Sequence, residues 1–203
     1  MIHAPPLKEL ADIEHGFGTA ADGAWVTDEA HAWLKQIHSG KIVRSKSSGL
    51  QGEADALITT APELWVSVRT ADCLPILLAD AEARIVAAVH AGWRGTVEQI
   101  AAETVQQMVE LGAHLSSIRA AIGPGIGLCC FEVGPEVSPH FGAEGKTCVD
   151  LAEANERQLL DSGLDLDNIW ISKQCTKCNP DLFHSYRRDA ESAGRMVSAI
   201  RII

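Results

Sequence analysis

The chain has 203 residues, of which 46% are hydrophobic and 22% charged, and its formal net charge is -10. This balance is ordinary for a globular protein, and the length suits one domain spanning residues 1–203. The negative charge argues against nucleic acid or an anionic membrane as a partner, because phosphate groups are bound by clustered Lys and Arg. We therefore expect a small-molecule ligand and a chain that works as a monomer or homodimer.

The N-terminal sequence predicts no export signal. Residues 1–10 contain two prolines and lack the apolar core of a signal peptide. No stretch of the sequence approaches the ~18 apolar residues of a membrane span. We expect a cytoplasmic protein whose six cysteines are mostly reduced.

Short apolar runs bounded by turn residues predict buried strands at residues 54–58, 64–70, 76–78 and 84–89. Later in the chain, similar patterns predict strands at residues 118–122, 168–172 and 194–203. Strands and helices follow one another without a regular alternation. This order favours an α+β fold with mixed β-sheets and helices packed outside them.

Two helices are predicted from apolar spacing and capping residues. The first covers residues 96–111, with Thr96 as its N-cap and Gly112 at its end. The second begins after Asp150, whose spacing from Glu153 resembles a capping box, and ends near Gly163.

Three residues in unlike segments have the chemistry of metal ligands: His38, Cys73 and His90. Imidazole nitrogen and thiolate sulfur suit Zn²⁺, and three protein ligands leave the fourth tetrahedral position free, as in catalytic zinc sites. Each residue also has a purely structural interpretation, as a hydrogen-bonded core histidine or a small buried thiol. The glycines at 92 and 95 permit tight turns beside His90 and favour a site.

The remaining cysteines and glycines give weaker signals. Cys175 and Cys178 have zinc-ribbon spacing, but the sequence contains no second Cys-x-x-Cys, and the adjacent Cys129 and Cys130 are a poor chelate. Packed thiols are therefore the preferred interpretation. The segment 123–127 lacks the spacing of a nucleotide loop and predicts a tight turn.

Arginines provide candidate contacts to an anionic group of the substrate, because a guanidinium binds phosphate or carboxylate with two parallel hydrogen bonds. Arg94 lies four residues after His90, and the segment 185–189 combines Tyr186, Arg188 and a carboxylate. A surface ion-pair cluster is the structural alternative for this segment. We predict that Arg94, Arg188 and Tyr186 bind substrate.

Several motifs together resemble one known family, and they extend over nearly the whole chain. They are Glu53-Ala-Asp-Ala-Leu-Ile-Thr59, Thr70-Ala-Asp-Cys-Leu-Pro75, Ala88-Val-His-Ala-Gly-Trp-Arg-Gly-Thr96, Ala121-Ile-Gly-Pro124, Cys130-Phe-Glu-Val133 and Ser185-Tyr-Arg-Arg-Asp189. The family is the laccase-domain, YfiH-like group, variously called polyphenol oxidase, purine nucleoside phosphorylase or peptidoglycan editing factor. The resemblance implies an α/β/β/α layered fold and a metal held by His38, Cys73 and His90. One departure is a shortened segment after His15-Gly-Phe17, which lacks the family's Arg-Gly-Gly-Val-Ser.

The family's names suggest three activities. Four-copper oxidase chemistry is disfavoured, because the chain has eight histidines and no His-x-His pair, although copper remains an alternative occupant of a single site. The name purine nucleoside phosphorylase suits the residues best, and the resemblance then implies a zinc enzyme, with one ion per chain, that uses phosphate to cleave adenosine, inosine and methylthioadenosine, with adenosine deaminase as a further activity. Its expected catalytic residues are Cys73, His90 and Arg94. The alternatives are a hydrolase that edits peptidoglycan precursors, with Cys73 as nucleophile and His90 as base, and a single-copper polyphenol oxidase.

Overall fold

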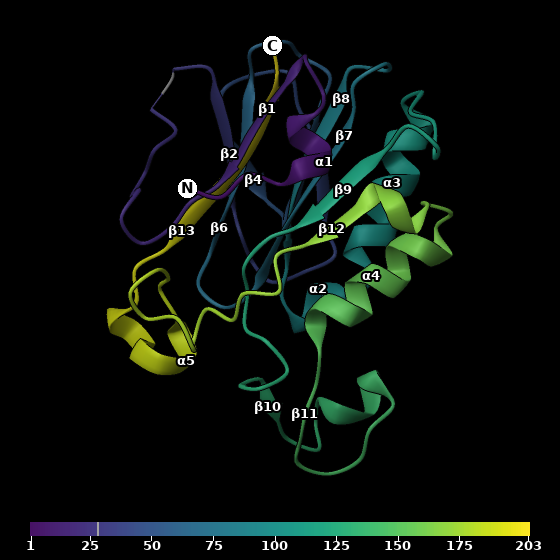
Figure 1. Ribbon diagram of the computed structural model, residues 1–203. Coiled ribbons are helices and arrows are strands. Elements are labelled where there is room, and N and C mark those ends of the chain that lie inside the picture. The colour runs from purple at the N-terminus through teal and green to yellow at the C-terminus, as the bar shows by residue number, and fades with distance from the viewer. Residues whose placement is uncertain (28) are drawn as a thin grey trace.

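The computed structural model describes residues 1–27 and 29–203 and contains two large β-sheets packed face to face (Figure 1). The first sheet has five strands, in the order β1 (Ile13–Phe17), β13 (Met196–Ile202), β6 (Trp65–Thr70), β2 (His31–Lys35) and β4 (Gly49–Glu53). The second has six, in the order β12 (Ile169–Ile171), β9 (Arg119–Ile122), β7 (Leu74–Asp80), β8 (Ile85–Ala91), β5 (Ala56–Thr59) and β3 (Ile42–Arg44). Both sheets mix parallel and antiparallel pairs, which confirms the predicted α+β class with mixed sheets.

The core lies on both faces of the six-stranded sheet. Along β7 successive side chains alternate, so that Leu77 points into the space between the sheets while Ile76 and Leu78 point outward. The inner layer is completed by Val66, Val68 and other residues of the five-stranded sheet. Strands buried on both faces carry apolar residues at every position, which explains the continuous runs in the sequence.

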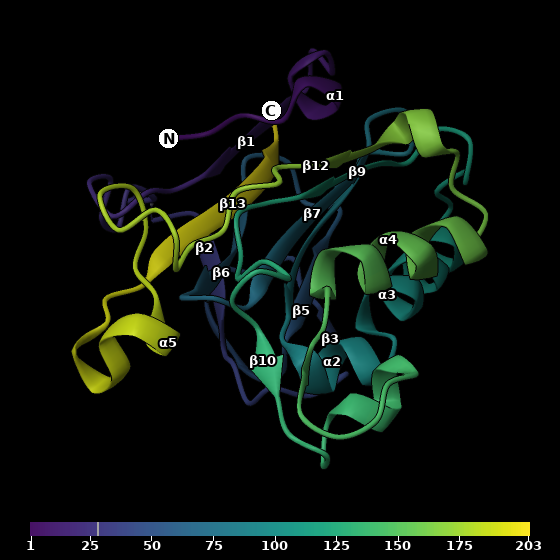
Figure 2. The same ribbon diagram turned by 60° about the horizontal axis from the view of Figure 1, so that its bottom comes forward.

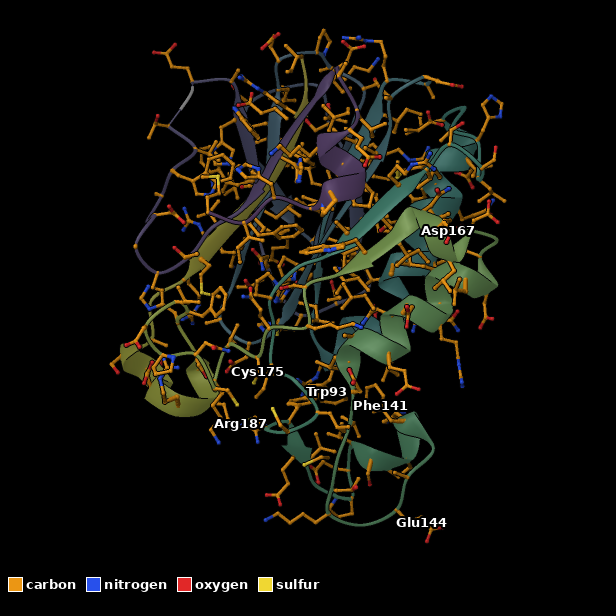
Figure 3. All side chains as sticks on the ribbon, in the orientation of Figure 1. Trp93, Phe141, Glu144, Asp167, Cys175 and Arg187 are labelled. Carbon is orange, nitrogen blue, oxygen red and sulfur yellow. The ribbon has the colours of Figure 1, made fainter. Side chains whose placement is uncertain are left out.

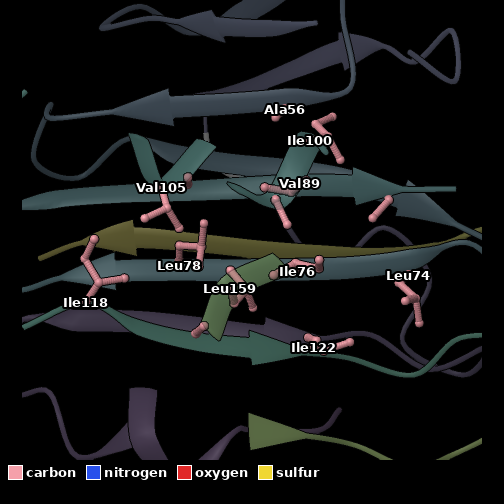
Figure 4. Close-up of a cluster of buried hydrophobic side chains, with 14 of the residues drawn as sticks. Ala56, Leu74, Ile76, Leu78, Val89, Ile100, Val105, Ile118, Ile122 and Leu159 are labelled. Carbon is pink, nitrogen blue, oxygen red and sulfur yellow. The ribbon is translucent and has the colours of Figure 1, made fainter. Parts of the chain in front are cut away.

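Two helices cover the outer face of the six-stranded sheet, α3 (Ile100–Glu110) and α4 (Leu151–Asp161) (Figure 2). Ile100 and Val105 of α3 and Leu159 of α4 pack on Ile76, Leu78 and Val89 (Figure 4). The short α1 (Pro5–Lys8) contacts β1, β9 and β12. On its outer side the five-stranded sheet packs with Trp25 and Val26 through Trp65 and Val197.

The predicted helix over 96–111 is wrong at its start. The structure has two helices there, α2 (Trp93–Val97) and α3, because Gln99 adopts a left-handed conformation with φ of 58°. Thr96 therefore lies inside α2, where its hydroxyl donates to the Gly92 carbonyl at 3.0 Å, and it caps neither helix. Gly112, with φ of 107°, follows the end of α3 as predicted.

The second helix agrees with its prediction. Asp150 caps α4 by accepting hydrogen bonds from the backbone N–H groups of Ala152 and Glu153. The other elements include a small sheet of β10 (Glu132–Val133) and β11 (Thr147–Cys148), the helix α5 (Tyr186–Asp189), and short 3-10 helices at Ser138–Phe141, Leu166–Asn168 and Ala190–Ser192. Across the described residues, no helix combines the length and apolar character that a membrane crossing requires.

Candidate metal centre

The predicted donors His38, Cys73 and His90 come together at one end of the two sheets. His38 lies three residues after β2, Cys73 directly precedes β7, and His90 is the penultimate residue of β8. Antiparallel pairing of β7 with β8 sets Pro75 opposite His90 and so brings Cys73 close to it. The three ligand atoms lie within 4.8 Å of one another, and the two imidazole rings stand nearly perpendicular at 4.9 Å.

Asp55 holds both histidine segments in place, and the sequence-based search for site residues missed it. Its carboxylate lies 2.8 Å from Nδ1 of His90 and accepts hydrogen bonds from the backbone N–H groups of His38 and Ser39. The Asp55 carbonyl also accepts from the His90 N–H at 2.7 Å. Because Nδ1 of His90 is engaged, Nε2 is the nitrogen left to bind a metal. The signal in the sequence was a carboxylate between alanines, within a predicted buried strand.

The charges of the site are strongly coupled. Burial raises the pKa of the Cys73 thiol, but hydrogen bonds with His38 and His90 outweigh burial and lower it to about 6. Burial likewise disfavours a charged His90, yet hydrogen bonds with Asp55 and Cys73 raise its pKa to about 9. The Asp55 carboxyl, which burial alone would make less acidic, has its pKa lowered to about 2 by His90 and Ser39. Without metal, Cys73 is thus a thiolate paired with an imidazolium at neutral pH.

Two residues near the donors adopt backbone conformations that are rare for side chains other than glycine. His38 has φ of 58° and Asp72, which precedes Cys73, has φ of 89°. Hydrogen bonds compensate this strain: His38 is tied to Asp55, and the Asp72 carboxylate accepts from Thr176 Oγ1 and the Arg187 N–H, both at 2.6 Å. Strain maintained in this way is typical of functional sites.

The donor set fits a zinc ion. One thiolate and two imidazoles are established zinc ligands, and a buried carboxylate behind one imidazole is the usual support of such a ligand. His38 is exposed, Cys73 half-buried and His90 buried, so the cluster is accessible from solvent on the His38 side, and three protein ligands would leave a fourth coordination position free. Zinc binding would displace a proton from His90, because an imidazole binds metal in its neutral form and Cys73 is already a thiolate.

The predicted substrate-binding residues differ in their surroundings. Arg94 is exposed, and its guanidinium lies 4.2 Å from the centroid of the Trp93 ring, with no acceptor bonded to it among the described residues. Arg188, in contrast, donates to both carboxylate oxygens of Asp189 and to the carbonyls of Phe183 and Thr176. The Tyr186 hydroxyl donates to Glu191 at 2.9 Å. Of the three, Arg94 is the one with donors available for an anion.

A hollow of about 640 Å³ lies between α2 and α4 near Thr96 and Arg157. Its volume suits a small ligand, but none of the three donors lines it. We therefore locate the candidate site by the chemistry of its donors. Trp93, which follows β8, and Arg187 lie at the end of the molecule that is opposite the C-terminus (Figure 3).

Comparison with known proteins gives the family. Residues 11–203 match the profile of the family described as multi-copper polyphenol oxidoreductase laccase. The chain belongs to this family. Among solved structures, YlmD from Geobacillus stearothermophilus superposes with a TM-score of 0.86 at 28% identity, covering 98% of this chain and 94% of that one. The Bacillus licheniformis hypothetical protein YfiH gives 0.87 at 26% identity, covering 97% and 95%.

Relatives in this laccase family carry names from purine metabolism. A Deinococcus radiodurans protein named purine nucleoside phosphorylase is 42% identical, covering 97% of this chain and 77% of the relative. A protein of an unknown prokaryotic organism, named adenosine deaminase RL5, is 40% identical over 78% of this chain and 65% of the relative. The predicted family resemblance is therefore confirmed, and the names of the relatives indicate an enzyme.

Proposed function

We propose that this protein is a zinc-dependent purine nucleoside phosphorylase that converts adenosine, inosine or methylthioadenosine and phosphate to free base and ribose 1-phosphate. Adenosine deamination at the same site is the accompanying activity. The observation that carries the proposal is the cluster of His38, Cys73 and His90, which supplies three donors of a zinc site and would leave a fourth coordination position free. The names of the relatives supply the substrate class.

A zinc ion at this site would supply Lewis-acid chemistry, polarising an oxygen of phosphate or water. Phosphorolysis forms a bond from a phosphate oxygen to C1′ of the ribose and breaks the bond from C1′ to the base, which leaves with a proton. Arg94 is suited to hold the phosphate, because its guanidinium is exposed and already oriented by stacking on Trp93. His90, whose Nδ1 contacts Asp55, would hold the metal through its other ring nitrogen and would move no proton in the reaction.

A second candidate has its own supporting observation. The pKa of Cys73 is lowered to about 6 beside His90, the condition of a cysteine nucleophile with a basic partner. This arrangement would suit a hydrolase that cleaves an amide of a peptidoglycan precursor. It assigns no role to His38, whereas the zinc proposal uses all three donors.

A substrate panel with metal-quantified protein tests the proposal. Adenosine, inosine and methylthioadenosine are incubated with and without phosphate, beside a muramyl-serine precursor. The proposal predicts base release that requires phosphate and falls with Cys73→Ala, while Cys148→Ser, a change at an exposed free cysteine outside the site, keeps full activity. Serine release without base release would select the hydrolase.

Alkylation separates the two roles of Cys73. A zinc-bound thiolate reacts slowly with iodoacetamide, because the metal holds its electron pair, and reacts quickly after chelation. The phosphorylase proposal therefore predicts protection of Cys73 in zinc-loaded protein. Rapid labelling at full zinc occupancy, with activity lost in step, would favour the cysteine hydrolase.

A further inference from the structure

Four cysteines outside the site described above form a second cluster of metal donors. Cys129 and Cys130 lie in the loop between β9 and β10, and Cys175 and Cys178 lie in the loop between β12 and α5. The four sulfurs lie within 4.8 Å of one another. Cys178 Sγ is 3.6 Å from Cys129 Sγ and 3.3 Å from Cys130 Sγ. Zinc with tetrahedral bonds of roughly 2.3 Å sets its sulfurs roughly 3.8 Å apart, so only small shifts are needed.

The fold explains why two unlike cysteine pairs meet. Strands β9 and β12 are parallel neighbours, with Ile122 paired to Ile171, so their following loops leave the same edge of the sheet. Gly125 then forms a bridge with Cys175, and its carbonyl accepts from the Thr176 N–H at 2.9 Å. The sequence alone favours packed thiols here, because it contains no second Cys-x-x-Cys; the structure places the adjacent pair of another loop, Cys129 and Cys130, beside Cys175 and Cys178.

The backbone around Cys175 has features of a metal-binding turn. The Gly127 N–H donates to Cys175 Sγ at 3.3 Å, and the Asn179 side chain donates to the Cys175 carbonyl at 2.8 Å. N–H groups aimed at a sulfur stabilise its thiolate form, which is the form that binds zinc. A Cβ at position 127 would lie 3.3 Å from the Cys175 Cβ and 3.5 Å from Cys129 Sγ, so glycine permits the close approach of the two loops.

The cluster is connected to the turn that carries Cys73. Thr176, between the two loop cysteines, donates through Oγ1 to Asp72 at 2.6 Å, and its carbonyl accepts from Arg188. The Ile126 N–H donates to the Asp72 carbonyl at 2.7 Å. Both cysteine-bearing loops therefore contact Asp72, the residue before Cys73. A metal that joins these loops would hold the Asp72 turn in its left-handed conformation.

We propose that Cys129, Cys130, Cys175 and Cys178 bind a structural zinc ion in a closed tetrathiolate site that joins the two loops and supports the turn of Asp72 and Cys73. Four protein ligands leave no open position, so this ion has no direct part in the reaction. The competing state is a disulfide from Cys178 to Cys130, which would require the two sulfurs to approach to roughly 2.05 Å. A disulfide uses two of the four cysteines and excludes the metal.

Metal stoichiometry of protein purified under reducing conditions tests the proposal. We expect two zinc ions per chain in the wild type and in Cys148→Ser, and one ion each in Cys175→Ser/Cys178→Ser and in Cys73→Ser. Loss of one ion in Cys73→Ser together with no loss in Cys175→Ser/Cys178→Ser would overturn the proposal. It is equally overturned if mass spectrometry of the reduced, zinc-supplemented wild type shows a disulfide among the four cysteines.

Cobalt substitution of the wild type keeps the test independent of how the variants fold. Co²⁺ bound to four thiolates gives a several-fold stronger thiolate-to-metal charge-transfer absorption than Co²⁺ bound to one. We expect titration of the metal-free wild type to show both kinds of site, with the intense band of a tetrathiolate in addition to the weaker band of a single thiolate. A wild-type spectrum with the intensity of a single thiolate throughout the titration would contradict the tetrathiolate site.

Discussion

Nδ1 of His90 lies 2.8 Å from Oδ1 of Asp55, and both side chains are almost completely shielded from solvent. The same carboxylate receives the backbone N–H of His38, so one buried anion orients two of the three donors that carry the candidate zinc. Such a contact fixes which nitrogen of the imidazole is free and makes that nitrogen a stronger ligand. The candidate metal centre would therefore depend on a residue that is not itself one of the three donors.

Asp55→Asn should weaken zinc binding at the His38, Cys73 and His90 site by roughly 10–100-fold, because the neutral amide supports the His90 ring less well. Competition with a chromophoric chelator measures the change. The matched control is Glu53→Gln, which removes only an exposed ion pair with Lys35 and should leave stability nearly unchanged, because surface ion pairs contribute little. Equal zinc affinity in Asp55→Asn and Glu53→Gln would show that Asp55 has no supporting role.

We expect a side chain at position 92 to lower the stability of the fold while Cys73 is present. A Cβ on residue 92 would lie 2.9 Å from Cys73 Sγ and 3.5 Å from His38 Cδ2. We expect Gly92→Ala to cost ~1–3 kcal/mol of unfolding free energy through overpacking. The same change in a Cys73→Ala background should cost much less, since the nearest atom is gone. Denaturant unfolding of the four proteins gives the coupling energy, and a coupling near zero would contradict the close contact.

Arg94→Ala should reduce kcat/KM for phosphorolysis by at least tenfold, chiefly through a higher KM for phosphate, and leave Tm nearly unchanged. The Arg94 guanidinium stacks on Trp93 and holds no acceptor within the described parts of the chain, so its loss disturbs little structure. Arg84→Ala, at the opposite end of the β7–β8 hairpin, is the control and should keep normal kinetics. If both variants show the same phosphate KM as the wild type, phosphate binds elsewhere.

His15 should make the fold acid-sensitive. Burial, aided by the neighbouring His3, lowers the pKa of His15 to about 4, and its Nε2 accepts a hydrogen bond from the Ala4 N–H at 2.9 Å. Because the folded pKa lies below the unfolded value of about 6.5, the unfolded state binds more protons between these values. The contribution is complete above about pH 6.5, is lost as pH falls towards 4, and is on the order of 2 kcal/mol.

Urea unfolding from pH 7 to pH 4.5 measures this dependence. His15→Gln should flatten the part of the stability profile that His15 causes, whereas His114→Gln, at an exposed histidine, should leave it unchanged. Profiles of equal slope in His15→Gln and the wild type would assign the acid sensitivity to other groups.

The sequence predicts most of the central strands of the sheets but few of the strands at their edges, because only central strands are buried on both faces. Strands β7 and β8 are buried on both faces, so their uninterrupted apolar runs are unmistakable. Strand β4, Gly49–Glu53, is half-exposed at the edge of its sheet and carries no apolar run. The break at Gln99 has no local signal, because contacts from distant residues hold α2: the side chains of Asn155 and Gln158 donate to Thr96.

The candidate site, like the fold, could be predicted from the sequence only in part. Ligand chemistry alone selected His38, Cys73 and His90, and the structure sets them together. The contribution of Asp55 depends on the antiparallel pairing of β5 with β8, which sets Asp55 beside His90 and which no spacing in the sequence encodes. The cysteine cluster depends on the parallel pairing of β9 with β12, a long-range contact, so its two halves look unrelated along the chain.

An anomalous difference map at the zinc absorption edge, from crystals of the zinc-loaded protein, tests the central claim most directly. We predict a peak bonded to Cys73 Sγ and to one ring nitrogen each of His38 and His90, at distances of roughly 2.0–2.3 Å. Nδ1 of His90 should remain on Asp55. Zinc-loaded crystals with no peak among these three residues would contradict the assignment of this cluster as the metal centre.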